Sequence, residues 1–262
     1  MIIANRTKRL MQDGGVALGL GLRHSRTVDI AQIGAACGFD WLFIDCEHSA
    51  MNIETAAQIS VASLGFGITP IVRVPGFEHH HATRALDNGA QGIVFPHVDD
   101  GAQAASIADL THFPPQGHRS IGGPQPQLNH AALPVAQTMA LVNQETLVVA
   151  MIESAQGIAQ SEAIAAVPGI DVLFIGTNDL CAELGIPGQF GDAKVEQAYA
   201  SVIAACQRHG KFAGMGGVYS AELMQKYISM GVQFVLAGTE LSFLMAGAKD
   251  RIGMIRGFTA KT

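Results

Sequence analysis

Two acidic residues follow consecutive apolar segments and could share a divalent cation. Glu153 lies near the end of the segment 147–154, and Asp179 directly follows the segment 171–177. If these segments are neighbouring parallel strands, their axes lie about 5 Å apart. Carboxylates this close repel each other unless a proton or a cation lies between them. Their oxygens suit Mg2+ or Mn2+, with Co2+ or Zn2+ as alternatives, whereas solvated acids or a metal-free acid/base pair would have the same spacing.

A second group of ionisable residues ends the apolar segment WLFIDCEHS (41–49). Asp45, Glu47 and His48 occupy three of four consecutive positions there. The usual pKa of histidine suits a general base, and the neighbouring acids favour that role for His48 over that of a loop histidine without a function. We therefore predict that His48 is the base and that Asp45 orients a neighbouring group.

Arg73 lies inside the apolar segment IVRVP, where a positive charge is costly to bury unless it meets anions. It could pair with Asp45 from the adjacent strand. It could also hold a substrate carboxylate or a developing oxyanion. The two roles are compatible with each other.

The sequence GTNDL at 176–180 has the form of a strand end that opens into a helix. Backbone N–H groups at such a terminus bind anions. We predict that this turn holds a substrate carboxylate beside the metal, and we favour a carboxylate over a phosphate because the Gly-rich Walker pattern is missing. The predicted binding residues are Gly176, Thr177, Asn178 and Asp179.

Other kinds of catalysis have little support. A Schiff-base mechanism needs a lysine in the inner or upper part of a strand, and of the six lysines only Lys211 touches an expected strand, at its beginning. A serine hydrolase would need a GxSxG turn, which the chain lacks. The three adjacent histidines at 79–81 cannot face one site together, so we interpret them as the exposed start of a helix.

The elements that carry these residues repeat eight times. Apolar, strand-like segments occupy 16–22, 40–45, 69–74, 92–98, 147–154, 171–177, 211–217 and 234–240. Ala-rich segments with helical spacing lie between them, at 27–38, 52–65, 157–169 and 221–231 for example. Eight strand–helix units in about 250 residues are typical of a (β/α)8 TIM barrel, and no GxGxxG follows the first strand to favour a doubly wound sheet. We predict one barrel domain, 1–262.

Three further segments complete the prediction. The N-terminal residues form a short amphipathic helix that ends at 13–15, and the last residues, from Leu241, form another helix. The Pro- and Gly-rich segment 111–134 is too long for a simple connection. We interpret it as a βα loop near the mouth of the barrel.

The composition of the chain indicates which binding partners and which cellular compartment to expect. The net charge of −6, without a basic stripe, gives no reason to expect nucleic acid binding. No apolar run approaches the length of a membrane-spanning helix, about 18 residues. The four cysteines form no CxxC pair, which favours a reducing cytoplasm. Hydrophobic residues make up 48% and charged residues 15% of the chain, so we expect other subunits to cover part of its surface.

Taken together, these segments resemble the HpcH/HpaI aldolase family, the metal-dependent class II pyruvate aldolases. The resemblance covers nearly the whole chain. It rests on the motifs GFDWLFIDCEHS, PIVRVPG, RALDNGAQGIVFPHV, PPQGHRSIGG, MIES, DVLFIGTNDL and LAGTELSFL. It implies a TIM barrel whose C-terminal helix is exchanged between subunits, assembled as a homohexamer.

The resemblance also implies roles for individual residues. Glu153 and Asp179 match the metal ligands, and His48 matches the general base. Arg73 matches the residue that stabilises the enolate. Asp87, in RALDNG, matches an acid that raises the basicity of the histidine, and we expect it to act across a subunit interface.

The implied reaction is reversible cleavage of a 4-hydroxy-2-oxo acid into pyruvate, or hydroxypyruvate, and an aldehyde. A lyase of the citrate-lyase β type that acts on an acyl-CoA, and a barrel that only binds 2-oxo acids, are the alternatives. The chain departs from the family pattern at Met151, often a glutamine that touches substrate, at Cys46, often glycine, and at Thr177 and Asn178, often Pro-Ala. None of these departures touches the proposed metal ligands or base, so we expect the chemistry to be retained.

Overall fold

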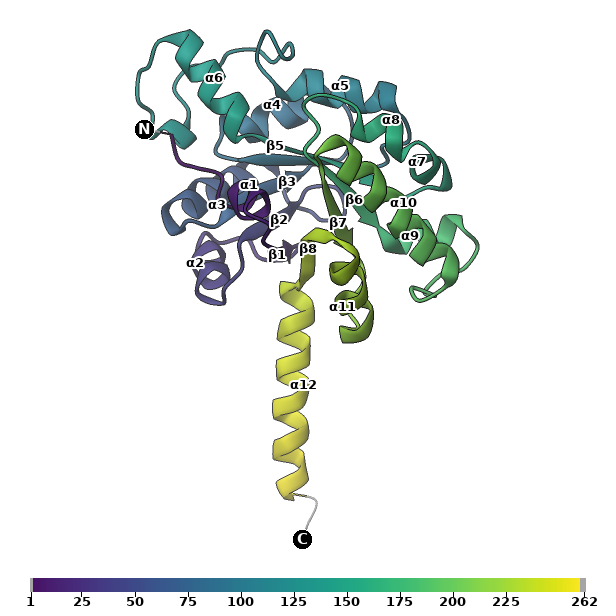
Figure 1. Ribbon diagram of the computed structural model, residues 1–262. Coiled ribbons are helices and arrows are strands. Elements are labelled where there is room, and N and C mark those ends of the chain that lie inside the picture. The colour runs from purple at the N-terminus through teal and green to yellow at the C-terminus, as the bar shows by residue number, and fades with distance from the viewer. Residues whose placement is uncertain (1, 260–262) are drawn as a thin grey trace.

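Eight parallel strands close into a barrel in the order β1 to β8 (Figure 1). The computed structural model describes residues 2–259, so residues 1 and 260–262 of the predicted domain lie outside the described part. The strands are β1 (Ala17–Leu22), β2 (Trp41–Asp45), β3 (Thr69–Arg73), β4 (Gly92–Phe95), β5 (Leu147–Ile152), β6 (Val172–Gly176), β7 (Phe212–Gly216) and β8 (Val232–Thr239). Nearly all their residues are buried on both faces, which explains their continuous apolar sequences. The predicted TIM barrel is confirmed.

Helices surround this barrel on the outside (Figure 1). They are α1 (Arg6–Gln12), α2 (Asp29–Ala36), α3 (Ile53–Phe66), α4 (His79–Asp87), α5 (Gly101–Thr111), α6 (Val135–Glu145), α7 (Ala155–Ala159), α8 (Ser161–Ala165), α9 (Thr177–Glu183), α10 (Ala193–His209), α11 (Ala221–Met230) and α12 (Glu240–Thr259), with a 3-10 turn η1 (Pro126–Leu128). Local signals set their limits. For example, the Asn52 side chain caps the start of α3, and Gly67 ends it with a φ of 69°.

The N-terminal helix and the helical start at His79 agree with the sequence predictions. The segment 157–169, predicted as one helix, instead forms parts of the two short helices α7 and α8, because the chain turns at Gln160 between them.

Large side chains fill the inside of the barrel. The rings of Trp41 and Phe234 stack with their centroids 3.9 Å apart. Gly19 makes room for them, because a Cβ at this position would lie 2.2 Å from the indole of Trp41. The barrel is therefore a packed core, and a ligand can bind only at its ends.

The Pro- and Gly-rich segment does not lie where the sequence prediction placed it. Residues 101–111 form the complete helix α5 after β4, so the segment follows a helix and leads through η1 into α6, which precedes β5. The Gln127 side chain donates hydrogen bonds to the carbonyls of Leu86 and Ala90, which precede β4. The segment thus covers the amino-terminal end of the barrel, and the predicted βα loop near the mouth was wrong.

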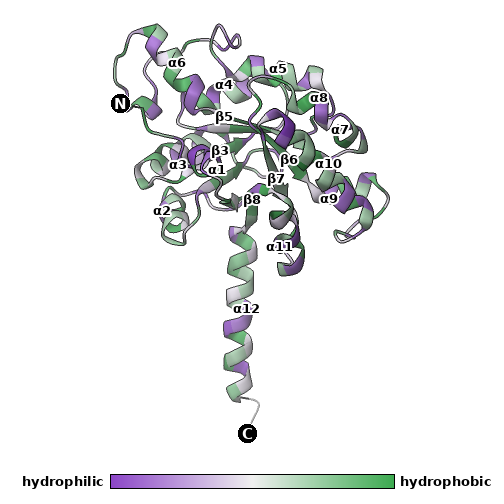
Figure 2. Ribbon diagram, in the orientation of Figure 1, coloured by the Kyte–Doolittle hydropathy of each residue, from purple (hydrophilic) through white to green (hydrophobic). Residues whose placement is uncertain are grey.

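The last helix, α12, extends away from the barrel and leaves most of its surface uncovered (Figure 1). Apolar and polar residues alternate along it (Figure 2). Its exposed large apolar residues are Leu241, Phe243, Leu244, Met245, Ile252, Met254, Ile255 and Phe258. Within residues 2–259, no helix combines the length and hydrophobicity that crossing a membrane requires.

Candidate active site

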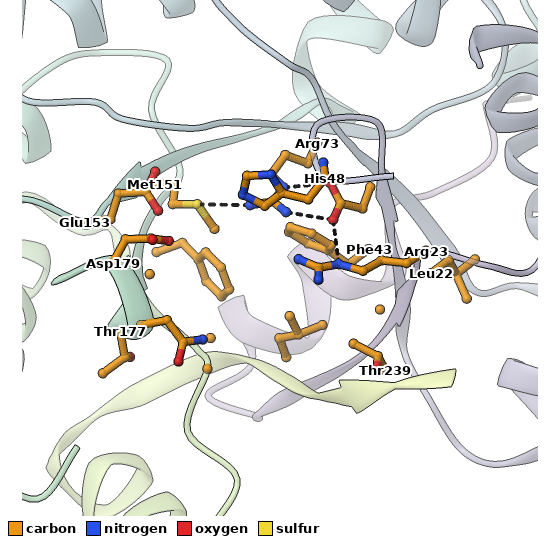
Figure 3. A pocket seen from close by; sticks show the side chains of 18 of the residues that line it. Leu22, Arg23, Phe43, His48, Arg73, Met151, Glu153, Thr177, Asp179 and Thr239 are labelled. Carbon is orange, nitrogen blue, oxygen red and sulfur yellow. Dashed lines mark hydrogen bonds and ion pairs between the residues drawn. The ribbon is translucent and has the colours of Figure 1, made fainter. Parts of the chain in front are cut away.

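A cavity of about 280 Å³ opens at the carboxyl ends of the strands. This volume is at the lower limit of the range of small-molecule sites, about 300–1,000 Å³. Every strand except β4 contributes to its lining, from the middle or end of the strand or from the residues that follow. Figure 3 shows the side chains of many of these residues. The lining includes Arg23, Asp45, His48, Arg73, Met151, Glu153, Gly176, Thr177, Asn178 and Asp179. Most of the predicted site residues therefore meet in one pocket.

Asp45 lies at the centre of one side of this pocket and is fully buried. Its two oxygens accept hydrogen bonds from Nε and Nη2 of Arg73, at 3.0 and 2.7 Å. Arg23 Nε donates a further bond at 2.9 Å. Burial raises the pKa of Asp45, but the hydrogen bonds and charge of Arg73 outweigh this effect and hold the pKa below its usual value. Asp45 is therefore ionised, and it fixes both guanidinium groups.

The guanidinium group of Arg73 also has contacts on the edge that faces away from Asp45. Its Nη1 lies 3.0 Å from Oε2 of Glu47, and the same nitrogen contacts the sulfur of Met151 at 3.8 Å. The guanidinium carbon lies 5.0 Å from the centre of the Phe43 ring. The side chain is only 6% exposed, so it is a rigid cation at the pocket wall and not a mobile surface arginine.

Glu153 faces the pocket from the end of β5 and is 3% exposed. The backbone N–H of His97 donates to its Oε1 at 2.9 Å, and Nδ1 of His97 lies 3.0 Å from the same oxygen. Burial raises the pKa of Glu153 to about 7, and the charges of Asp179 and Glu47 add to the effect, although His97 opposes it. A cation at this carboxylate would favour its charged form.

Asp179 is exposed in the first turn of α9, beside Glu153 (Figure 3). The intervening residue Gly176 leaves space for the acid pair, because a Cβ there would lie 2.5 Å from Oε2 of Glu153. The part of the chain that the structure describes contains no cluster of three or more His, Cys, Asp or Glu side chains around a metal position. Two oxygen donors whose repulsion a cation relieves fit a hard divalent ion that keeps water or substrate oxygens as its other ligands.

The remaining predicted pocket residues take different positions. His48 lies at the rim with its side chain 52% exposed, and its backbone N–H donates to Oδ1 of Asp45 at 3.1 Å. Asn178 faces the cavity. The hydroxyl of Thr177 instead bonds to that of Tyr199 at 2.7 Å within the core, so the side chain of Thr177 stabilises the turn.

Asp87 is not part of the pocket within one chain. It ends α4, where Oδ1 accepts hydrogen bonds from Arg119 at 2.6 Å and from Gln125 at 3.1 Å. Arg119 is buried beneath it. The expectation that Asp87 acts across a subunit interface stays a prediction.

Three residues that shape the site carry no role that was predicted from the sequence. Arg23 follows β1, Glu47 pairs with Arg73, and His97 holds Glu153. The rule that polar residues at the carboxyl ends of barrel strands face the site would have selected Arg23. The roles of Glu47 and His97 depend on the directions of their side chains, which strand positions do not reveal.

The barrel and a pocket with two carboxylates on one side define the class of protein as a (β/α)8 enzyme. Residues 23–246 match the family described as HpcH/HpaI aldolase/citrate lyase. The chain belongs to this family, and it is an aldolase, as predicted.

Characterised relatives extend over nearly the same length. The chain is 37% identical to a 4-hydroxy-4-methyl-2-oxoglutarate aldolase of Hapsidospora irregularis, over 97% of this chain and 94% of that protein. It is 31% identical to a hydroxypyruvate/pyruvate aldolase of Chromohalobacter salexigens, over 87% and 89%. The crystal structure of an HpcH/HpaI aldolase from Desulfitobacterium hafniense superposes with a TM-score of 0.90 at 28% identity, covering 95% of this chain and 96% of that one.

The raised pKa of Glu153 predicts how stability depends on pH in metal-free protein. Between the usual pKa of 4.5 and about 7, the folded state binds more protons than the unfolded state, so stability falls as pH rises. Between pH 5 and pH 8, the free energy of unfolding of the wild type should therefore decrease. Glu153→Gln should make this decrease smaller by on the order of 1–3 kcal/mol. Urea unfolding of both proteins at pH 5 and pH 8 measures the free energy of unfolding at each pH.

The matched control for this experiment is Glu54→Gln, at the exposed first turn of α3. It should leave the difference between the two pH values unchanged. If the free energy of unfolding depends on pH equally in the wild type and in Glu153→Gln, the surroundings do not disfavour the charged form of Glu153.

Proposed function

We propose that this aldolase cleaves 4-hydroxy-2-oxo acids reversibly into pyruvate, or hydroxypyruvate, and an aldehyde, with a divalent cation as cofactor. The observation that carries the proposal is that acidic and basic side chains lie on opposite sides of one pocket. Glu153 and Asp179 lie on one side, and Arg73, held by Asp45, lies on the other (Figure 3). The substrates named for the two relatives described above support the choice of a 2-oxo acid.

Glu153 and Asp179 would hold the cation. When bound, the cation supplies positive charge beside the 2-oxo group and the carboxylate of the substrate, where negative charge develops. Mg2+ or Mn2+ suits the two oxygen donors best, and Co2+ and Zn2+ are the other ions to test. The backbone N–H groups of the turn at 176–179 would bind the substrate carboxylate.

Each residue of the pocket would then have its own role in the reaction. His48 removes the proton from the C4 hydroxyl, the C3–C4 bond breaks, and its electron pair forms the enolate of pyruvate while the aldehyde leaves. Arg73 stabilises the charge on the enolate oxygen, as a fixed cation in a water-poor site does efficiently. A proton delivered to C3 then completes pyruvate. Asp45 keeps Arg73 in place, and Met151 packs against it.

A second copy of the chain would complete the site. The exposed apolar residues of α12 are more than a monomer usually leaves uncovered. This supports exchange of α12 between subunits, in a hexamer. Asp87 would then reach the His48 of a neighbouring copy and raise its basicity. All four cysteines are free thiols, which is compatible with a cytoplasmic location.

Removal of metal should abolish activity. Protein stripped with EDTA should lose at least about 1,000-fold in kcat/KM, since the cation supplies several kcal/mol of transition-state stabilisation. Mn2+ or Mg2+ should restore it, but not in Glu153→Ala or Asp179→Ala. Glu54→Ala serves as the control that responds like the wild type. Full turnover by stripped protein would contradict the metal requirement.

Replacement of His48 should stop proton transfer without preventing binding. In the synthetic direction, pyruvate must lose a C3 proton, so NMR in D2O should show exchange of its methyl protons. His48→Ala should slow this exchange by about 100-fold or more. His209→Ala, at the end of α10 and outside the pocket lining, is the control. Exchange at the wild-type rate in His48→Ala would rule out His48 as the base.

A further inference from the structure

Arg23 contributes a positive charge at an unexpected position in the pocket. It follows β1, lines the cavity, and lies across it from Glu153 and Asp179 (Figure 3). In a barrel of eight strands, β1 and β5 face each other across the axis. Arg23 therefore marks the end of the cavity opposite the proposed cation.

The backbone at Arg23 is held rigidly. The carboxylate of Glu240, where β8 runs into α12, accepts hydrogen bonds on Oε1 from the backbone N–H groups of Arg23 and His24, both at 2.6 Å, and of Ser25 at 3.1 Å. Burial raises the pKa of Glu240, but these backbone hydrogen bonds hold it below its usual value. The turn is therefore anchored by a charged group.

The side chain of Arg23 is held at only one point. Its Nε donates to Oδ2 of Asp45 at 2.9 Å, which fixes the direction of the guanidinium plane. Across residues 2–259, Nη1 and Nη2 have no hydrogen bond or ion pair with the protein. The side chain remains 44% exposed, and its outer edge faces the cavity (Figure 3).

Arg73, the other guanidinium in the pocket, differs in this respect. Nε and Nη2 of Arg73 are used by Asp45, and its Nη1 by Glu47. Its charge is balanced by two carboxylates, whereas Arg23 shares a single one. Arg23 therefore has a vacant pair of N–H groups for an incoming anion.

The surroundings select the kind of anion. The cavity between the two polar ends is lined by the rings of Phe43 and Phe174 and by Leu236. Its volume, about 280 Å³, admits a short carbon chain. A phosphate would carry a greater negative charge toward the ionised Asp45, while a carboxylate carries one charge and matches the planar arginine edge.

We propose that Arg23 is the specificity-determining residue that binds a second, distal carboxylate, so that the preferred substrates are 4-hydroxy-2-oxo dicarboxylic acids. This inference rests on the proposed function for the placement of the first carboxylate. The distal carboxylate pairs with Nη1 and Nη2 while Nε stays on Asp45. When a monocarboxylic acid of equal length binds, Nη1 and Nη2 of Arg23 contact water instead of a carboxylate.

Two unreactive analogues test the inference without catalysis. 2-Oxoglutarate and 2-oxopentanoate have the same chain length, lack the C4 hydroxyl, and differ in the distal carboxylate. In calorimetry of the Mn2+-loaded protein, 2-oxoglutarate should bind about 10- to 100-fold more tightly, the effect of one charge-assisted interaction. Arg23→Met should remove this preference, and Arg23→Lys should keep part of it.

The matched control is Arg26→Met. Arg26 belongs to the same turn and donates to the carbonyl of Ser25, but it is not part of the cavity lining. Its replacement should leave both affinities unchanged. Equal binding of the two analogues by wild-type protein would overturn the assignment.

Turnover separates this inference from the proposed function. With 4-hydroxy-2-oxoglutarate, Arg23→Met should lower kcat/KM by about 10- to 100-fold, mostly through KM, and with 4-hydroxy-2-oxopentanoate by only a few-fold. Equal losses for both acids would assign Arg23 to support of Asp45 alone and contradict the inference. If the wild type cleaves neither acid but prefers 2-oxoglutarate in binding, the proposed function fails and the anion site stands.

Discussion

The carboxylate of Asp45 lies between two guanidinium groups at the end of β2, and the arrangement of the pocket depends on this contact. Parallel pairing places Asp45 directly beside Arg73, the last residue of β3. A buried carboxylate costs several kcal/mol unless it is paired, and breaking such a pair costs about 3–5 kcal/mol. Its Oδ1 also accepts hydrogen bonds from the backbone N–H groups of Glu47 and His48. One acid therefore sets the positions of both arginines and of the turn that carries the proposed base.

The barrel separates two kinds of acid around its mouth. Asp45, the last residue of β2, and Glu47, which follows the strand, are neutralised by arginine, and the low pKa of Asp45 reflects its pairing with Arg73. Within residues 2–259, neither Glu153 nor Asp179, after β5 and β6, forms an ion pair with arginine or lysine, and burial raises the pKa of Glu153. A cation is therefore favoured on one side only. Under the proposed function, this asymmetry would orient a bound 2-oxo acid with its reacting end at the acid pair and its other end toward β1.

Much of this arrangement could be predicted from the sequence, because polar residues at the ends of apolar segments converge in a parallel barrel. That rule identified Asp45, Arg73 and Glu153 and placed them on one rim. The segment 111–134 lies at the other end of the barrel from the predicted position, because residues 101–111 form α5 and the segment follows that helix. Side-chain directions were equally inaccessible. The hydroxyl of Thr177 turns into the core toward Tyr199, which its position after β6 does not indicate.

The central claim is that Glu153 and Asp179 together hold the catalytic cation. Crystals soaked with Mn2+ and pyruvate, measured at the manganese absorption edge, test it most directly. We expect an anomalous peak in the pocket within coordination distance of a carboxylate oxygen of each residue. A peak held by other side chains, or no peak in the pocket of active enzyme, would contradict the account.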